Sequence, residues 1–153
     1  MSAVRPIAGA GLLVALSLAC RNVDAVDPPA VIDGNWLYHE TLVDNLYGLT
    51  CADTGTYTFT QSGPKFSGSY VQTGKCHNGS DPRVLGNSGH GQVTDGSVTS
   101  VHVQFTAGGT CTYEGLLSNA KDAVNSGTGI CQFVDSATSR PYSMQITWTM
   151  SKQ

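Results

Sequence analysis

Between Cys51 and Cys76 the chain reads CADTGTYTFTQSGPKFSGSYVQTGKC. The segments Thr54–Gln61 and Lys65–Thr73 are rich in Thr, Tyr, Phe and Ser, and they flank the turn sequence Ser62-Gly63-Pro64. β-branched and aromatic residues on both sides of a Gly-Pro turn are typical of a hairpin. We therefore expect two antiparallel strands that meet at this turn.

Pairing these strands about the turn places three pairs opposite one another: Tyr57 with Tyr70, Phe59 with Gly68, and Cys51 with Cys76. Side chains alternate between the two faces of a strand, so all six residues share one face. This register predicts a cross-strand disulfide between Cys51 and Cys76.

A second hairpin is predicted from Cys111–Leu117 and Ser126–Cys131, with Asn119–Asn125 as its loop. The same test of register places Cys111 opposite Cys131, Tyr113 opposite Gly129, and Gly115 opposite Gly127. Each bridge closes a loop of roughly 20 to 26 residues and is worth about 3 kcal/mol. A zinc site is the alternative use of four cysteines, but no C-x-x-C pair occurs, and we expect neither metal nor cofactor.

Composition favours an all-β domain. The chain has 153 residues, of which 12% are charged and 18 are Gly, and its formal net charge is −3. This length suits about one domain, and the eight Lys and Arg form no cluster, which argues against nucleic-acid binding. No segment keeps the 3.6-residue apolar spacing of a helix over a useful length.

Further strands are predicted at Asn35–Thr41, Gly89–Thr94, Ser97–Thr106 and Met144–Met150. Asp95-Gly96 is expected to be the turn of a hairpin, residues 75–88 a polar connection, and residues 42–49 a helical turn or a loop. About eight antiparallel strands joined mostly by short turns can close on themselves, which removes sheet edges. The predicted fold is a single up-and-down antiparallel β-barrel of about eight strands, braced by disulfides.

In such a barrel the last strand pairs with the first, which brings Lys152 beside Trp36. Gly34-Asn35-Trp36 resembles the Gly-x-Trp motif on the first strand of calycin barrels, the lipocalins and avidins. The segments GTYTFTQSG and KFSGSY also resemble the early hairpin of avidin-like and small bacterial lipocalin-like lipoproteins. This resemblance implies a barrel that binds a small ligand, with Lys152 packed over Trp36 at one end.

The N-terminus has the form of a secretory signal. One basic residue, Arg5, precedes the uncharged run IAGAGLLVALSLA at residues 7–19, which is shorter than the roughly 20 residues that span a bilayer. Ala19-Cys20 resembles the end of a bacterial lipoprotein signal, and lipidation of Cys20 would account for the odd number of cysteines. We expect a signal peptide at 1–19, a lipidated tether at 20–30 and the barrel domain at 31–153. Ordinary secretion is the alternative. By resemblance to enterobacterial lipoprotein sorting, Arg21 after the cysteine favours an outer membrane over an inner one.

Seven aromatic side chains fall on the inward face of the predicted strands: Tyr57, Phe59, Phe66, Tyr70, Phe105, Tyr113 and Trp148. They would either fill the barrel or line a cavity at its open end, where Tyr hydroxyls orient a small apolar ligand.

No catalytic constellation emerges from the spacing of the polar residues. The carboxylates are scattered and are expected to be solvated; the weakest hypothesis is a hydrolase that uses His39 and Glu40 as a local acid and base. We expect a non-enzymatic, secreted or lipid-anchored envelope protein that binds a small apolar ligand or a protein partner. A structural or interaction module with a filled barrel is the alternative. Membrane contact is expected through the lipid alone, and nucleic acid is not an expected partner.

Overall fold

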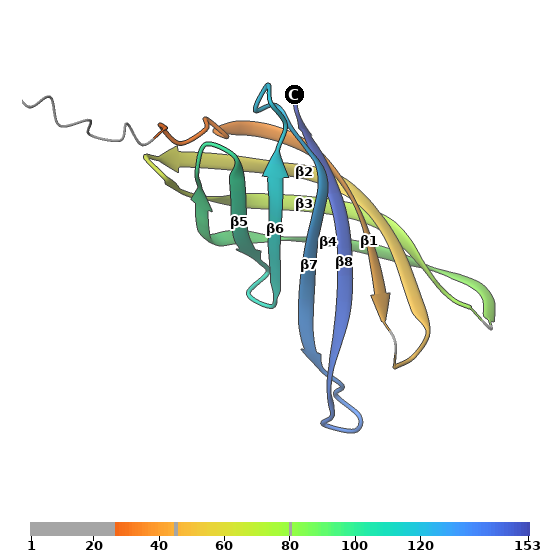
Figure 1. The fold of residues 1–153 in the computed structure, drawn as a ribbon. Coiled ribbons are helices and arrows are strands. Elements are labelled where there is room, and N and C mark those ends of the chain that lie inside the picture. The colour runs from red at the N-terminus through yellow and green to blue at the C-terminus, as the bar shows by residue number, and fades with distance from the viewer. Residues whose placement is uncertain (1–26, 45, 80) are drawn as a thin grey trace, which may run out of the picture.

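A computed structural model describes residues 27–44, 46–79 and 81–153. Eight antiparallel strands pair in chain order and the eighth pairs with the first, so the sheet is a closed barrel (Figure 1). The strands are β1 Gly34–Asp44, β2 Leu49–Ser62, β3 Lys65–Asn78, β4 Asp81–Val98, β5 His102–Ala107, β6 Cys111–Leu117, β7 Ala123–Val134 and β8 Pro141–Lys152. The predicted up-and-down barrel is confirmed. The signal at 1–19 and the lipidation site Cys20 lie outside the described residues.

Both predicted disulfides are present, and both hairpins have the predicted register. Cys51 pairs with Cys76 across β2 and β3, and Cys111 pairs with Cys131 across β6 and β7. Tyr57 faces Tyr70 as expected. Two bridges of this kind indicate that the chain folds in an oxidising compartment.

The predicted Asp95-Gly96 hairpin turn is wrong. β4 continues through these residues to Val98, and the register between β4 and β5 shifts between Thr94 and Ser97. Asp95 has a φ of 54°, and a Cβ on Gly96 would lie 2.4 Å from the carbonyl oxygen of Phe66. Asp-Gly readily adopts the backbone that a tight turn needs, but a β-bulge needs it as well. The chain reverses at residues 99–101 instead.

Residues 75–88 are not a connection but the paired ends of β3 and β4. These strands pair out to Asn78 and Asp81 and project beyond the barrel wall as a long arm (Figure 1). Cross-strand pairing overrides the weak strand propensity of this polar, Gly-rich sequence.

The strand β1 extends to Asp44, so part of the segment 42–49 is strand rather than a helical turn or a loop. The carboxylate of Asp44 accepts hydrogen bonds from the backbone N–H groups of Leu46 and Tyr47 in the turn that follows.

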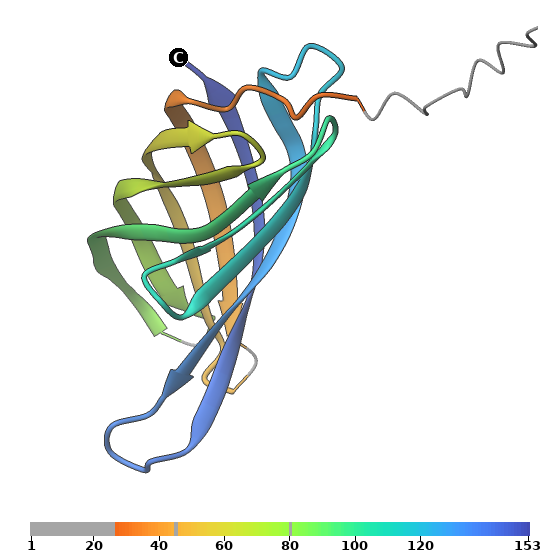
Figure 2. The same ribbon diagram turned by 90° about the vertical axis from the view of Figure 1, so that its left-hand side faces the viewer.

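The chain before β1 closes one end of the barrel, as Figure 2 shows. Ile32 is fully buried there, and its carbonyl accepts a 2.7 Å hydrogen bond from Nε1 of Trp36. Nζ of Lys152 lies 5.8 Å from the centre of the Trp36 ring and donates to the carbonyl of Val31. We call this closed end the narrow end and the opposite end, which bears the β3–β4 arm, the wide end.

Aromatic rings fill the middle of the barrel. Tyr57 lies at their centre, 4.4 Å from Tyr38 and 5.2 Å from Phe105 between ring centroids. Phe105 in turn stacks on Tyr113 at 4.9 Å and meets Trp148 edge-on. This packed layer separates the closed narrow end from the interior of the wide end. Within the described residues no helix is long and apolar enough to cross a membrane.

Candidate functional site

A cavity of about 330 Å³ lies inside the wide end, with the aromatic layer between it and the narrow end. Both disulfides line it, as do Glu40, Leu42, Tyr70, Tyr113, Phe133 and Met144. Its volume is at the lower end of the roughly 300–1,000 Å³ range of small-molecule sites. The wall is therefore mixed: covalent bridges and apolar side chains make up one part of it, and polar side chains, which also include Gln72, Asn87 and Thr110, make up the other.

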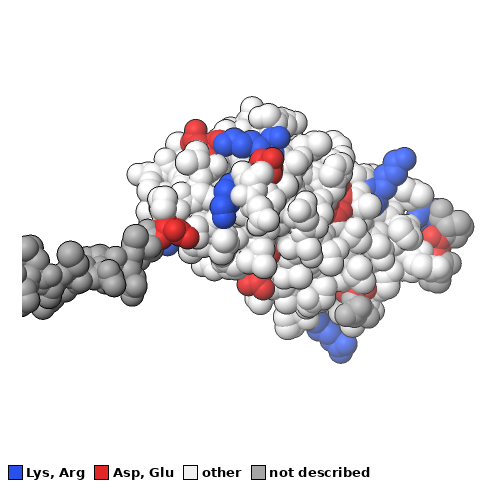
Figure 3. Space-filling model, turned by 45° about the horizontal axis from the view of Figure 1, so that its top comes forward, with Lys and Arg blue, Asp and Glu red and all other residues white. Residues whose placement is uncertain are grey.

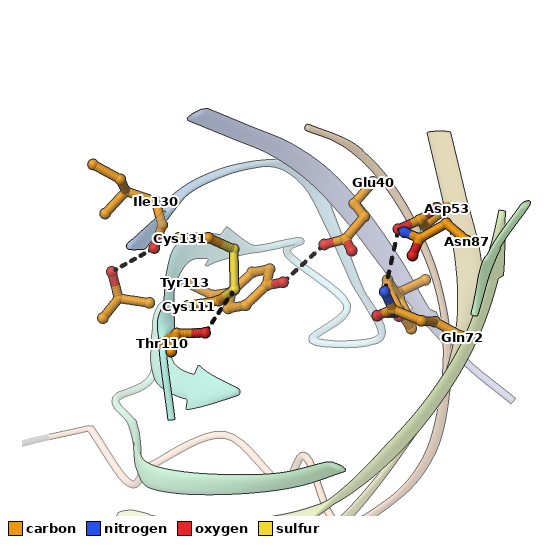
Figure 4. Close-up of a disulfide and its surroundings, with 11 residues drawn as sticks. Glu40, Asp53, Gln72, Asn87, Thr110, Cys111, Tyr113, Ile130 and Cys131 are labelled. Atoms are coloured by element: carbon orange, nitrogen blue, oxygen red, sulfur yellow. Dashed lines mark hydrogen bonds between the residues drawn. A yellow bond between two sulfur atoms is a disulfide. The ribbon is translucent and has the colours of Figure 1, made fainter. Parts of the chain in front are cut away.

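Glu40 provides the carboxylate of this cavity. Its side chain is 4% exposed, and Oε2 accepts a 2.9 Å hydrogen bond from the hydroxyl of Tyr113. The bond crosses the barrel interior from β6 to β1, which are not neighbouring strands (Figure 4). Among the described residues this is the one side-chain hydrogen bond of Glu40, so Oε1 has no protein donor.

A chain of polar side chains lies beside Glu40. The hydroxyl of Tyr38 donates to Oε1 of Gln72 at 2.8 Å, and Nε2 of Gln72 donates to Oδ2 of Asp53 at 3.2 Å. Nδ2 of Asn87 donates to the same Asp53 oxygen (Figure 4). The other Asp53 oxygen, Oδ1, is buried without a hydrogen-bond partner.

Burial dominates the electrostatics of the two acids. It raises the pKa of Glu40 to about 7, an effect that the Tyr113 hydrogen bond opposes and that the nearby Asp53 reinforces. Burial also raises the pKa of Asp53, against the hydrogen bond from Asn87. Glu40 and Asp53 are direct cross-strand partners on the inward face, an arrangement in which like charges repel.

Positive charge does not offset these acids. None of the described Lys, Arg and His side chains is buried, and none lines the cavity. The one ion pair among the described residues joins Asp81 to Arg83 on the exposed arm. Figure 3 shows isolated charges scattered over a face made mostly of uncharged residues. The interior of the wide end is therefore acidic and contains no counter-ion from residues 27–44, 46–79 and 81–153.

The seven aromatic residues expected at a ligand site divide into two groups. Tyr70 and Tyr113 line the cavity. The other five pack in the aromatic layer and toward the narrow end: Tyr57, Phe59, Phe66, Phe105 and Trp148. The filled barrel and the open cavity, posed as alternatives from the sequence, thus describe two halves of the same interior.

His39 and Glu40 do not form an acid–base pair in the structure. His39 is exposed on the outer wall while Glu40 is buried, because successive side chains of a strand point to opposite faces. Across the described residues, no group of three or more His, Cys, Asp and Glu could hold a metal ion.

Glu40 and Asp53 were expected to be solvated, and their burial corrects that expectation. The alternation of side chains could have shown this burial. Glu40 lies on the same face of its strand as Trp36, and Asp53 lies on the same face of its strand as Cys51 and Tyr57. An acid at an inward position of a barrel strand is a candidate for function, because burying a charge is costly without a partner.

Comparisons of the chain with protein-family models, with curated proteins and with solved structures return no match. The functional conclusion therefore depends on the chemistry of the cavity.

Proposed function

We propose that this protein is a non-enzymatic binding protein that holds a small ligand in the wide end of its barrel. The observation that supports this most directly is the cavity of about 330 Å³, whose wall combines apolar side chains and both disulfides with one carboxylate residue, two Tyr and two amide residues, Gln72 and Asn87. Pockets that combine an apolar wall with a few polar groups are typical of small-molecule sites.

The rigidity of the wall supports the same proposal. The two disulfides join β2 to β3 and β6 to β7 at the level of the cavity. A site already shaped before the ligand arrives loses less conformational entropy on binding. The aromatic layer beneath the cavity gives it a floor of large, closely packed rings.

The proposed localisation is the bacterial cell envelope, with a lipid anchor attached to Cys20. An oxidising compartment, which the two disulfides require, agrees with export. The lipid would hold the domain at a membrane surface without a spanning segment.

A neutral probe tests the cavity. 2-Phenylethanol, titrated into the folded protein, is expected to shift the backbone amide resonances of Leu42, Tyr113 and Met144. Leu42→Trp fills the cavity and should abolish these shifts, whereas Val43→Trp, one residue along on the outer face, should leave them intact.

Both variants are first checked for folding by circular dichroism. Shifts that survive Leu42→Trp, or shifts confined to residues of the outer wall, would contradict binding inside the barrel. If Leu42→Trp does not fold, the wild-type protein provides the test: shifted resonances from cavity-lining residues support binding inside the barrel, and shifted resonances from the outer wall contradict it.

A further inference from the structure

The acid in the cavity has features of a ligand-binding group rather than of a structural one. Glu40 is more than nine-tenths buried, faces the cavity, and has one carboxylate oxygen without a protein donor. Structural carboxylates in this chain are better satisfied: Asp44, equally buried, accepts two backbone N–H groups. A carboxylate with a single side-chain hydrogen bond and open space before it can accept a further donor from a ligand.

A second acid beside Glu40 increases the need for positive charge. Asp53 is its direct cross-strand partner, is 3% exposed, and has one buried oxygen without a hydrogen bond. Two neighbouring carboxylates in a low-dielectric interior repel each other unless a cation or a proton intervenes. None of the described Lys, Arg and His side chains forms an ion pair with either acid.

The other polar groups around Glu40 also suit a cation. Tyr113 on β6 and Tyr70 on β3 present hydroxyls, whose oxygens can accept a hydrogen bond as well as donate one. Nearby aromatic faces attract positive charge. Leu42, Phe133, Met144 and the disulfides form the apolar part of the wall, and the amide side chains of Gln72 and Asn87 line it as well.

We propose that the cavity binds a small protonated amine, with the ammonium group on the Glu40 carboxylate and an apolar body against the disulfide-lined wall. This inference rests on the proposed function and adds the chemical class of the ligand. It assigns recognition to Glu40, positioning of the carboxylate to Tyr113, and a long-range attraction to Asp53.

The test compares three probes of nearly equal size that differ in charge: 2-phenylethylamine, 2-phenylethanol and phenylacetate. Isothermal titration at pH 8 is expected to show the amine binding at least tenfold more tightly than the alcohol, and the carboxylate more weakly than either. An alcohol that binds as tightly as the amine overturns the inference and leaves the proposed function standing. If none of the three binds, both proposals are overturned.

Glu40→Gln removes the charge and retains the shape. We expect it to abolish the preference for the amine while the alcohol still binds, which also shows that the cavity is intact. Glu114→Gln is the matched control, since Glu114 is the other Glu of the chain and is exposed on the outer wall. A preference for the amine that survives Glu40→Gln contradicts the role assigned to Glu40.

The pH dependence tests the same point in the wild-type protein and decides if Glu40→Gln does not fold. With a pKa of about 7 in the empty site, Glu40 is mostly ionised at pH 8 and mostly protonated at pH 5.5. The titratable groups around it are Asp53 on β2, Tyr38 on β1, Tyr57 on β2, Tyr70 on β3 and Tyr113 on β6. Amine affinity should fall at least tenfold between these pH values and alcohol affinity should stay level; equal loss for both probes overturns the inference.

Discussion

At the scale of single residues, glycine makes room for the aromatic side chains of the interior. A Cβ on Gly127 would lie 2.2 Å from Cε2 of Trp148, whose Nε1 is fixed by a 2.9 Å hydrogen bond to the carbonyl of Thr128. The two hairpin registers place an aromatic residue directly opposite a glycine, Phe59 opposite Gly68 and Tyr113 opposite Gly129. The ring over Gly127 comes from β8, however, which a two-strand pairing does not show.

Gly127→Ala is therefore expected to destabilise the protein by about 1–3 kcal/mol, because the added methyl group overpacks the Trp148 site. Gly86→Ala is the control, since a Cβ there meets nothing within 4 Å. Urea unfolding of both variants measures the difference. An equal effect of the two substitutions would show that Trp148 does not occupy the space above Gly127.

The burial of Glu40 also predicts how stability depends on pH. The unfolded chain releases the Glu40 proton near the usual pKa of 4.5, whereas the folded protein holds it up to about pH 7. Between these values the folded state binds more protons, so the free energy of unfolding falls as pH rises. At pH 8 Glu40→Gln should be more stable than the wild type by up to about 3 kcal/mol.

Urea unfolding of the two proteins at pH 5 and pH 8 measures this effect. The difference between them isolates Glu40, since all other titrating groups are shared. If the difference in unfolding free energy between Glu40→Gln and the wild type does not grow from pH 5 to pH 8, the Glu40 carboxylate is exposed to water.

At the scale of elements, the cysteine pairs made both hairpins predictable. A cross-strand disulfide requires its two residues to be directly opposite, so each pair of cysteines fixed the register of a whole hairpin. No such constraint existed between β4 and β5, where Asp95-Gly96 proved to be a bulge. The long arm was missed because Gly, Asn and Ser have low strand propensity, which pairing with β3 overrides.

Loss of a bridge should weaken the element that it joins. The Cys51–Cys76 bridge spans 25 residues, and the double variant Cys51→Ala/Cys76→Ala is expected to lose about 3 kcal/mol of unfolding free energy. The measurement is urea unfolding without reductant, with the Cys111–Cys131 bridge retained. An unchanged midpoint would mean that the barrel wall holds this register without its covalent link.

At the scale of the whole molecule, the narrow end is closed and packed, so the space for the proposed ligand lies in the wide end. The eight-strand count and the closure of β8 onto β1 followed from the sequence pattern. The hydrogen bond from Tyr113 to Glu40 could not be predicted, since it joins strands that are not neighbours and depends on the width and stagger of the finished barrel.

Ile32 tests the closure of the narrow end. It precedes β1 and is fully buried, so Ile32→Ala should cost about 2–5 kcal/mol. Val31→Ala is the adjacent control, because Val31 is 66% exposed. Thermal unfolding of the two variants gives the comparison. Equal melting temperatures would mean that the segment before β1 is not part of the packed domain.

Carbon-13 NMR of the side-chain carboxyl of Glu40 tests the account most directly. The chain has two Glu residues, and the Glu40→Gln spectrum identifies the Glu40 resonance by its loss. The structure predicts a titration midpoint near pH 7, which moves lower when 2-phenylethylamine is bound. A midpoint near 4.5 that the amine does not change would contradict both the burial of the Glu40 carboxylate and its proposed contact with a ligand.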